Sequence, residues 1–174
     1  MIKELYKALS EKLVTITELK SIDLFRNQFQ TWGQETVYDF PLLFLKFDCD
    51  FQNRTQNTQT GTARIKVYVA TSFMGDTREG SATQDTGLQC FDIAQLAHEA
   101  LQGFEGTFFS ALSRTNLNQD ESPNSIYIIS QDYECDFVDT STDTAKDRIE
   151  ANPDIVLQTQ TTPTRTIRID NPNS

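Results

Sequence analysis

The most regular alternation of apolar and polar residues in the chain reads Gly61-Thr62-Ala63-Arg64-Ile65-Lys66-Val67-Tyr68-Val69-Ala70. Successive side chains of a β-strand point to opposite faces of its sheet, so this pattern predicts a half-buried strand over residues 62–72. Its predicted buried face consists of Ala63, Ile65, Val67 and Val69. The other face carries charged and aromatic side chains, which are Arg64, Lys66 and Tyr68.

A second alternating segment, residues 40–51, comes just before this strand. One of its faces carries Leu43, Leu45, Phe47, Cys49 and Phe51, and the other carries Phe44, Lys46, Asp48 and Asp50. The link at residues 52–60 has only polar side chains. Two alternating strands in succession most simply form an antiparallel hairpin, here with a long exposed tip. Across this hairpin, Asp48 and Asp50 are expected to pair with Arg64 and Lys66.

The remainder of residues 1–138 contains two helix patterns and three weaker strand patterns. Apolar residues recur every three or four positions in residues 2–16 and 88–104, which predicts two helices. The second helix has capping residues at both ends, Asp85 or Thr86 before it and Gly103 or Gly106 after it. Further strands are predicted at residues 17–29, 107–116 and 125–138. We therefore expect one α+β domain, a mainly antiparallel sheet with two helices packed on one face.

Residues 139–174 differ in composition and are expected to form a polar C-terminal extension. Thr, Asp, Asn, Gln and Pro dominate it, but Thr166-Ile167-Arg168-Ile169-Asp170 alternates like an extended strand. Fully extended, residues 154–170 span about 55 Å at ~3.3 Å per residue, whereas a domain of ~140 residues is roughly 37 Å across. Such an arm could reach a neighbouring subunit and add a strand to an exposed sheet edge. A disordered tail is the alternative.

The chain is strongly acidic. It has 25 Asp and Glu residues against 15 Lys and Arg residues, for a formal net charge of −10 at pH 7. This balance argues against a protein that reads DNA sequence, because such proteins bind phosphates through basic side chains. The acidity serves either solubility alone or a surface from which passing DNA is repelled. Without a membrane-length apolar run or a secretory-signal pattern, the expected site of assembly is the cytosol.

The sequence contains no strong catalytic motif, such as GxSxG, HExxH or a Gly-rich phosphate loop. Its reactive side chains are one histidine and three cysteines in apolar runs, namely His98, Cys49, Cys90 and Cys135. The cysteines are most simply small buried side chains, and the histidine an ordinary helix residue. The acidic side chains that could be imagined as a magnesium site are dispersed over a strand and a loop, at Asp48, Asp50, Asp76 and Asp85. We therefore expect no enzymatic activity, no cofactor and no metal.

Five residues are candidates for an assembly interface: Trp32, Arg54, Arg78, Ile167 and Ile169. Trp32 and the two arginines lie in polar segments predicted as loops, at residues 30–37, 52–60 and 74–87. Each long loop could equally be an ordinary connection, and Trp32 could fold back on the core. The two isoleucines lie on one face of the alternating segment of the arm.

The order of these elements resembles the tail terminator (tail completion) proteins of long-tailed phages. The similarity begins with an amphipathic helix and a strand that ends in a polar loop. It continues with a Pro-containing strand rich in Leu and Phe, here Tyr38-Asp39-Phe40-Pro41-Leu42-Leu43-Phe44-Leu45-Lys46-Phe47. The strand at residues 61–70, the helix at residues 88–104 and the segment Ser125-Ile126-Tyr127-Ile128-Ile129 complete it. The resemblance covers about residues 1–138 and is one of element order and pattern.

This resemblance implies a structural virion protein at the tail–neck junction. Its members form a ring, usually hexameric, that caps the tail tube, ends tube polymerisation and meets the head or neck, while DNA passes through the lumen. The implied partners are further copies of the chain, the tail tube protein and the head–tail connector or neck proteins. The family has no catalytic residues to carry over.

Two other functions stay open at this stage. Another head–tail connector subunit, a stopper or adaptor ring, would share the size, the acidity and the lack of catalytic motifs. A small-ligand-binding or enzymatic α+β domain would instead need a pocket with converging polar groups. Native mass separates a closed ring from a monomer that binds a metabolite.

Overall fold

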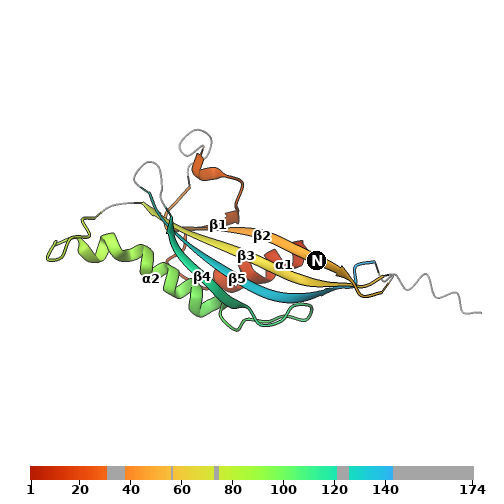
Figure 1. The fold of residues 1–174 in the computed structure, drawn as a ribbon. Coiled ribbons are helices and arrows are strands. Elements are labelled where there is room, and N and C mark those ends of the chain that lie inside the picture. Colours follow the sequence, from red (N-terminus) through yellow and green to blue (C-terminus); the bar gives the residue numbers. More distant parts are fainter. Residues whose placement is uncertain (31–37, 56, 73–74, 121–125, 143–174) are drawn as a thin grey trace, which may run out of the picture. The chain divides into compact units, whose positions relative to one another are not determined.

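A computed structural model describes residues 1–30, 38–55, 57–72, 75–120 and 126–142 (Figure 1). Its elements in chain order are the helix α1 (Ile2–Leu13), the strand β1 (Ser21–Leu24), the short 3₁₀ helix η1 (Gln28–Gln30), the strands β2 (Leu42–Asn53) and β3 (Gln59–Ser72), the helix α2 (Gln84–Leu101), and the strands β4 (Ser113–Asp120) and β5 (Ile126–Asp139). Apart from η1, this order is the predicted one. No helix in the described part of the chain is both long and apolar enough to cross a membrane.

The strands form a five-stranded sheet in the order β1-β2-β3-β5-β4 (Figure 1). Every neighbouring pair is antiparallel except β1 and β2, which are parallel. The chain leaves β3 through α2 and returns through the edge strand β4 to β5, which lies beside β3. The predicted α+β class with a mainly antiparallel sheet is confirmed.

Both helices cover the same face of the sheet, which we call the inner face. α1 contributes Leu5, Leu9 and Leu13 to the main core, and α2 contributes Cys90, Ile93, Ala94, Ala97 and Leu101. Against them pack Ala63, Ile65, Val67 and Val69 of β3, all at most 1% exposed. The predicted register of β3 is therefore confirmed. Burial of each large aliphatic side chain stabilises the fold by about 1.5–3 kcal/mol.

The opposite, outer face has its own apolar cluster at one end. Its buried members are Leu42, Phe44, Ala70, Ile126 and Ile128, covered by Phe25, Phe29, Tyr38, Phe40 and Tyr68. The ring of Phe44 lies 5.5 Å from that of Phe29 and 5.3 Å from that of Tyr38, measured between ring centroids. These aromatic side chains therefore cover this end of the outer face.

The strand predicted at residues 17–29 is observed only over Ser21–Leu24, and the packing explains why it ends there. Asn27 has a positive φ of 64°, which breaks the extended backbone. The chain then turns into η1, so that Phe25 and Phe29 can both reach Phe44. Their contacts with the second cluster outweigh the weak strand pattern.

The hairpin tip is shorter than predicted. Pairing continues to Asn53 opposite Gln59, so the link spans residues 54–58 rather than 52–60. The Gln59 side chain donates a hydrogen bond to Asn53 Oδ1 at 2.8 Å. Backbone pairing does not require apolar side chains, which is why the polar sequence hid the ends of both strands.

Other boundaries also differ from the prediction: α1 ends at Leu13 and not at residue 16, and α2 ends at Leu101 and not at residue 104. α2 begins at Gln84 after Thr83, so Asp85 lies within the first turn and is not the cap. Its carboxylate there still interacts favourably with the helix dipole. Gly103, with φ 75°, follows the end of α2 as predicted. β4 begins at Ser113 instead of residue 107, because only Phe109 forms a bridge to β5 before that point.

Candidate functional site

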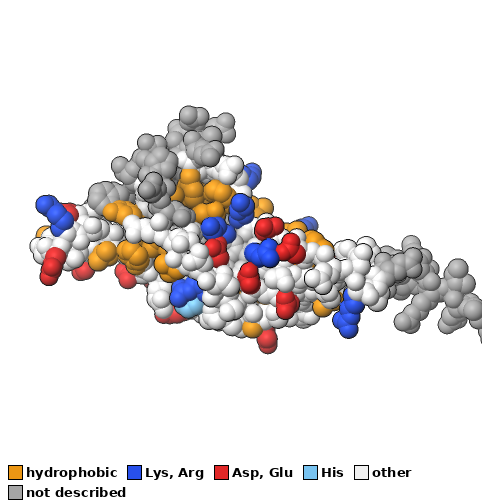
Figure 2. Space-filling view, in the orientation of Figure 1, with side chains coloured by type: hydrophobic (Ala, Val, Ile, Leu, Met, Phe, Trp, Pro, Cys, Tyr) orange, Lys and Arg blue, Asp and Glu red, His pale blue; other side chains and the backbone are white. Residues whose placement is uncertain are grey.

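Charged side chains form a ladder across the other end of the outer face (Figure 2). Arg64 lies at its centre, with Nη2 2.8 Å from Asp50 Oδ2 and Nε 3.2 Å from Glu134 Oε1. Both carboxylates raise the pKa of the Arg64 guanidinium, Asp50 more than Glu134. The predicted pairing of Asp50 with Arg64 is confirmed.

The other predicted ion pair is wrong. Lys66 Nζ lies 3.6 Å from Asp132 Oδ1 of β5, and not beside Asp48. In the register of the sheet Lys66 lies opposite Lys46 on one side and Asp132 on the other. Asp48 forms no ion pair with any residue in the described ranges. The Asp48 carboxylate is therefore available to an outside cation.

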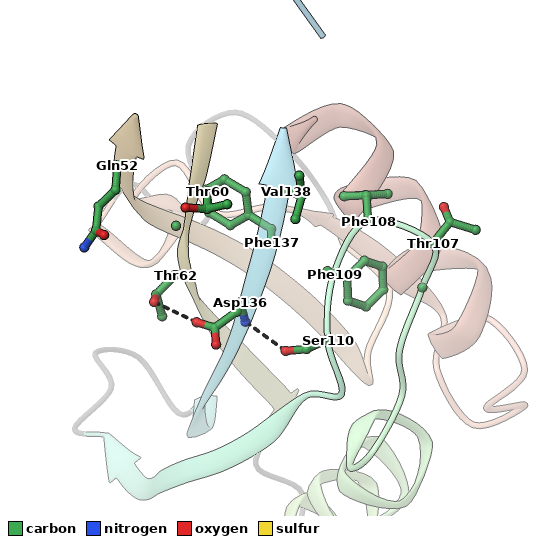
Figure 3. Close-up of a pocket in the computed structure, with 12 residues that line it drawn as sticks. Gln52, Thr60, Thr62, Thr107, Phe108, Phe109, Ser110, Asp136, Phe137 and Val138 are labelled. Carbon is green, nitrogen blue, oxygen red and sulfur yellow. Dashed lines mark hydrogen bonds between the residues drawn. The ribbon is translucent and has the colours of Figure 1, made fainter. Parts of the chain in front are cut away.

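A hollow of about 610 Å³ lies next to the ladder, where β2 and β5 end and β3 begins (Figure 3). It is lined by Gln52, Thr60, Gly61, Thr62, Gly106, Thr107, Phe108, Phe109, Ser110, Asp136, Phe137 and Val138. Thr62 Oγ1 donates to Asp136 Oδ1 at 2.9 Å, and the Asp136 backbone N–H donates to Ser110 Oγ at 2.9 Å. Among these lining residues there is one carboxylate and no histidine, cysteine or lysine. They supply no acid–base pair for catalysis.

A buried polar network joins α2 to the inner face. Gln131, fully buried, donates from Nε2 to the Ala94 carbonyl at 2.6 Å and accepts from the Tyr133 hydroxyl at 2.8 Å. Arg114 Nη1 donates to Gln131 Oε1 at 3.2 Å, and His98 Nδ1 lies 3.3 Å from the Tyr133 hydroxyl. Each of these four side chains has at least one partner within the set or on the backbone. The network fixes the helix against the sheet.

The environment of this network favours the neutral forms of His98 and Tyr133. Burial, and then the charge of Arg114, lower the pKa of His98. Burial raises the pKa of Tyr133, so that its hydroxyl stays protonated. A neutral histidine that is hydrogen-bonded to a neutral phenol fits a structural role better than proton transfer.

The three cysteines are free thiols. Cys90 and Cys135 are buried as predicted, and Cys49 is half-buried. Burial raises the pKa of Cys135 to about 11, and burial followed by the charges of Asp48 and Asp50 raises the pKa of Cys49. The described residues contain no group of three or more side chains placed to hold a metal ion.

Of the five predicted interface residues, the structure describes two, Arg54 and Arg78, and these two lie apart. Arg54 lies in the turn before β3, and Arg78 lies in the loop that follows it, so the two are at opposite ends of the sheet (Figure 1). Arg78 is 86% exposed and forms an ion pair with Asp76, whose pKa it lowers. Trp32, Ile167 and Ile169 lie outside the described residues, as does nearly all of the predicted arm.

Sequence patterns did not reveal one further feature, an open edge of the sheet. β1 pairs only with Leu42–Leu45, so the rest of β2, Lys46–Asn53, has no second neighbour among the described strands. We call residues 46–53 the β2 open edge. The length of this edge depends on where β1 ends, and no local sequence pattern predicts the end of β1.

Comparisons with known proteins give a likeness of fold and no family. No family model matches the chain, and no curated protein matches it by sequence. Among solved structures, the fold is similar to that of a chain in the virion of a native gene transfer agent (GTA) particle, with a TM-score of 0.52 at 12% sequence identity. The match covers 78% of this chain and 95% of the other chain. The two chains therefore share a fold, nearly complete in the virion chain.

Proposed function

We propose that this chain is a virion structural protein that forms a ring, with six copies as the expected number, at the end of a phage tail tube. There it would end tube polymerisation and present the surface that meets the head or neck, while DNA passes through the lumen without specific binding. The observation that carries the proposal is the fold shared with a chain of a virion particle over 95% of that chain. The same element order led to the resemblance with tail terminators.

The surface of the body supports assembly more than chemistry. The outer face presents exposed charges of both signs over β2, β3 and β5 (Figure 2), including Asp48 without an ionic partner in the described ranges. Such a surface favours a specific orientation between copies. An excess of acidic residues over the whole chain would also reduce adhesion of DNA to the lumen.

Native mass and electron microscopy of the purified protein test the proposal. A closed ring of about six subunits is expected, at high concentration or in the presence of tail tube protein. Persistent monomers under both conditions would reject it. Addition of the protein to polymerising tube protein separates a terminator from a stopper or adaptor ring, because only a terminator caps the tube and limits its length.

The second candidate function is the binding of a small ligand in the hollow beside Asp136. Its volume of about 610 Å³ is within the range of ligand sites, and Thr62, Ser110 and Asp136 converge on it. A monomer that retains a metabolite through purification, detected by native mass spectrometry, would favour this function. A ring with empty subunits would favour assembly.

A further inference from the structure

The β2 open edge has the chemistry of an acceptor for another strand. An unpaired edge presents rows of backbone N–H and C=O groups, which an extended peptide can satisfy. On the inner side of this edge Phe47 and Cys49 are half-buried, and Phe51 is 45% exposed. On the outer side lie Lys46, Asp48 and Asp50, a net charge of −1; Asp50 is ion-paired with Arg64, and Asp48 has no ionic partner in the described ranges. A matching strand would carry apolar side chains on one face and a basic side chain on the other.

We infer that residues 164–170 of a neighbouring copy add to the β2 open edge as a further strand. In that position Ile167 and Ile169 cover the inner-face side chains Cys49 and Phe51, and Arg168 faces the acidic outer side. Residues 164–170 contain Arg165, Arg168 and Asp170, for a net charge of +1. The net charge of this segment is therefore opposite to that of the edge. The inference rests on the proposed ring and names the contact that links its subunits.

The body ends in a suitable place for this exchange. Asp139, the last residue of β5, pairs with Gln59 beside the β2–β3 turn, and Thr142 Oγ1 donates to the Asn57 carbonyl at 2.8 Å. The arm therefore leaves the body at the same end of the sheet as Asn53, where the open edge ends. The chain from residue 143 to residue 163 can span up to about 70 Å when extended. That length is sufficient to reach an adjacent copy.

The opposite edge of the sheet is a poorer acceptor. On β4 the Arg114 backbone N–H donates to Gln102 Oε1 at 3.0 Å, and the Leu117 N–H donates to Asn116 Oδ1 at 2.9 Å. These side chains occupy backbone groups that an added strand would need. Residues 46–52 have no comparable bond to a side chain among the described residues. β2 is therefore the acceptor, and β4 serves as an internal reference.

Disulfide cross-linking to the native Cys49 tests the pairing in the full-length protein. Directly opposed residues of neighbouring strands have Cα atoms about 4.5–5.5 Å apart, within the range that a disulfide spans. Ile167→Cys and Ile169→Cys variants, oxidised under ring-forming conditions, should give covalent multimers that reduction dissolves. Thr166→Cys and Arg168→Cys, which face the other side, are the matched controls and should cross-link several-fold less. Cys49→Ala in the Ile167→Cys background should abolish the product.

Three results would overturn the exchange: equal cross-linking at odd and even positions, products that persist without Cys49, or a disulfide confined within single chains. Rings seen by electron microscopy without Cys49 cross-links would reject this contact and leave the proposed function intact. Monomers under every condition would reject both.

Hydrogen exchange gives a second, independent measurement. Deletion of residues 150–174 should leave the domain folded, weaken the ring and accelerate amide exchange in residues 46–52. Exchange in β4 should stay unchanged. Acceleration at both edges would indicate general loosening and would count against the inference, as would unchanged oligomerisation.

Discussion

The two ends of the outer face differ along the same three strands. At one end β2, β3 and β5 carry apolar side chains, which are Leu42, Phe44, Tyr68, Ala70, Ile126 and Ile128. At the other end they carry Lys46, Asp48, Asp50, Arg64, Lys66, Asp132, Glu134 and Asp136. Phe25, Phe29, Tyr38 and Phe40 cover the apolar end, and the charged end faces solvent (Figure 2). One end is completed by the protein itself, and the other is free for contacts with partners.

The switch from apolar to charged side chains occurs at the same position along all three strands, because the register of the sheet aligns them. Phe44 lies opposite Tyr68, and one step further Lys46 lies opposite Lys66. Like charges directly across an antiparallel pair are unfavourable. Asp132 on the other side of Lys66 offsets that repulsion. The boundary is thus a property of three aligned strands and not of any one of them.

The largest expected effect comes from Val67→Asp, on the inner face behind the charged end. Val67 is fully buried in the main core, so the carboxylate would lose its hydration without gaining a partner. We expect a loss of at least about 4 kcal/mol in the free energy of unfolding, and loss of the folded state. Chemical denaturation followed by circular dichroism measures it. Lys46→Asp, exposed and opposite Lys66, is the control and should change stability little. A soluble, stable Val67→Asp variant would show the register to be wrong.

Phe44→Ala tests the closed end of the outer face. Its ring is 1% exposed and contacts the rings of Phe25, Phe29 and Tyr38. Truncation of such a ring leaves a cavity and typically costs about 3–5 kcal/mol. The free energy of unfolding from urea denaturation provides the measurement. Lys46→Ala, one step along the same face, should stay within about 0.5 kcal/mol of the wild type. Similar losses for both variants would remove the distinction between the two ends.

The inner face was largely predictable from the sequence, whereas the outer face was only partly so. Alternation in β3 identified the buried positions Ile65 and Val67, because one apolar face opposite a charged one is a local signal. The run Leu42 to Leu45 is apolar on both faces, and alternation cannot say what covers the second face. That required the contacts of Phe25 and Phe29, which come from a segment predicted as a strand.

The candidate site was less predictable for the same reason. The pair between Asp50 and Arg64 lies within one hairpin and was predicted from it. The pair between Lys66 and Asp132 depends on β5 lying beside β3, a long-range choice that local patterns do not encode. The β2 open edge depends in turn on where β1 ends. Arg54 and Arg78 looked equivalent as loop residues, yet β3 separates them.

Gln131→Ala tests the buried network on the inner face. Gln131 lies next to Ser130, where the apolar and charged ends of the outer face meet. The substitution removes one acceptor of the buried Tyr133 hydroxyl, which keeps only the 3.3 Å contact with His98 Nδ1, and the side-chain donor to the Ala94 carbonyl inside α2. Unsatisfied buried groups cost about 1–3 kcal/mol each, partly relieved if water enters. We expect a loss of about 2–3 kcal/mol. Gln95→Ala, on the exposed surface of α2, is the matched control and should be nearly neutral. Equal effects would exclude a stabilising role for the network.

The smallest effect, and one of opposite sign, is expected for Ser130→Ala. Ser130 occupies the boundary position on the outer face of β5, between Ile128 and Asp132, and is fully buried. Its hydroxyl has no hydrogen-bond partner among the described residues. Removal of a buried hydroxyl without a partner eliminates its desolvation cost, so the free energy of unfolding should rise by up to about 1 kcal/mol. Thermal unfolding at matched protein concentration would show a slightly higher Tm. A clear loss of stability would mean that the hydroxyl is hydrogen-bonded in the folded protein. Ser130 would then belong to the polar end of the outer face and not to the apolar end.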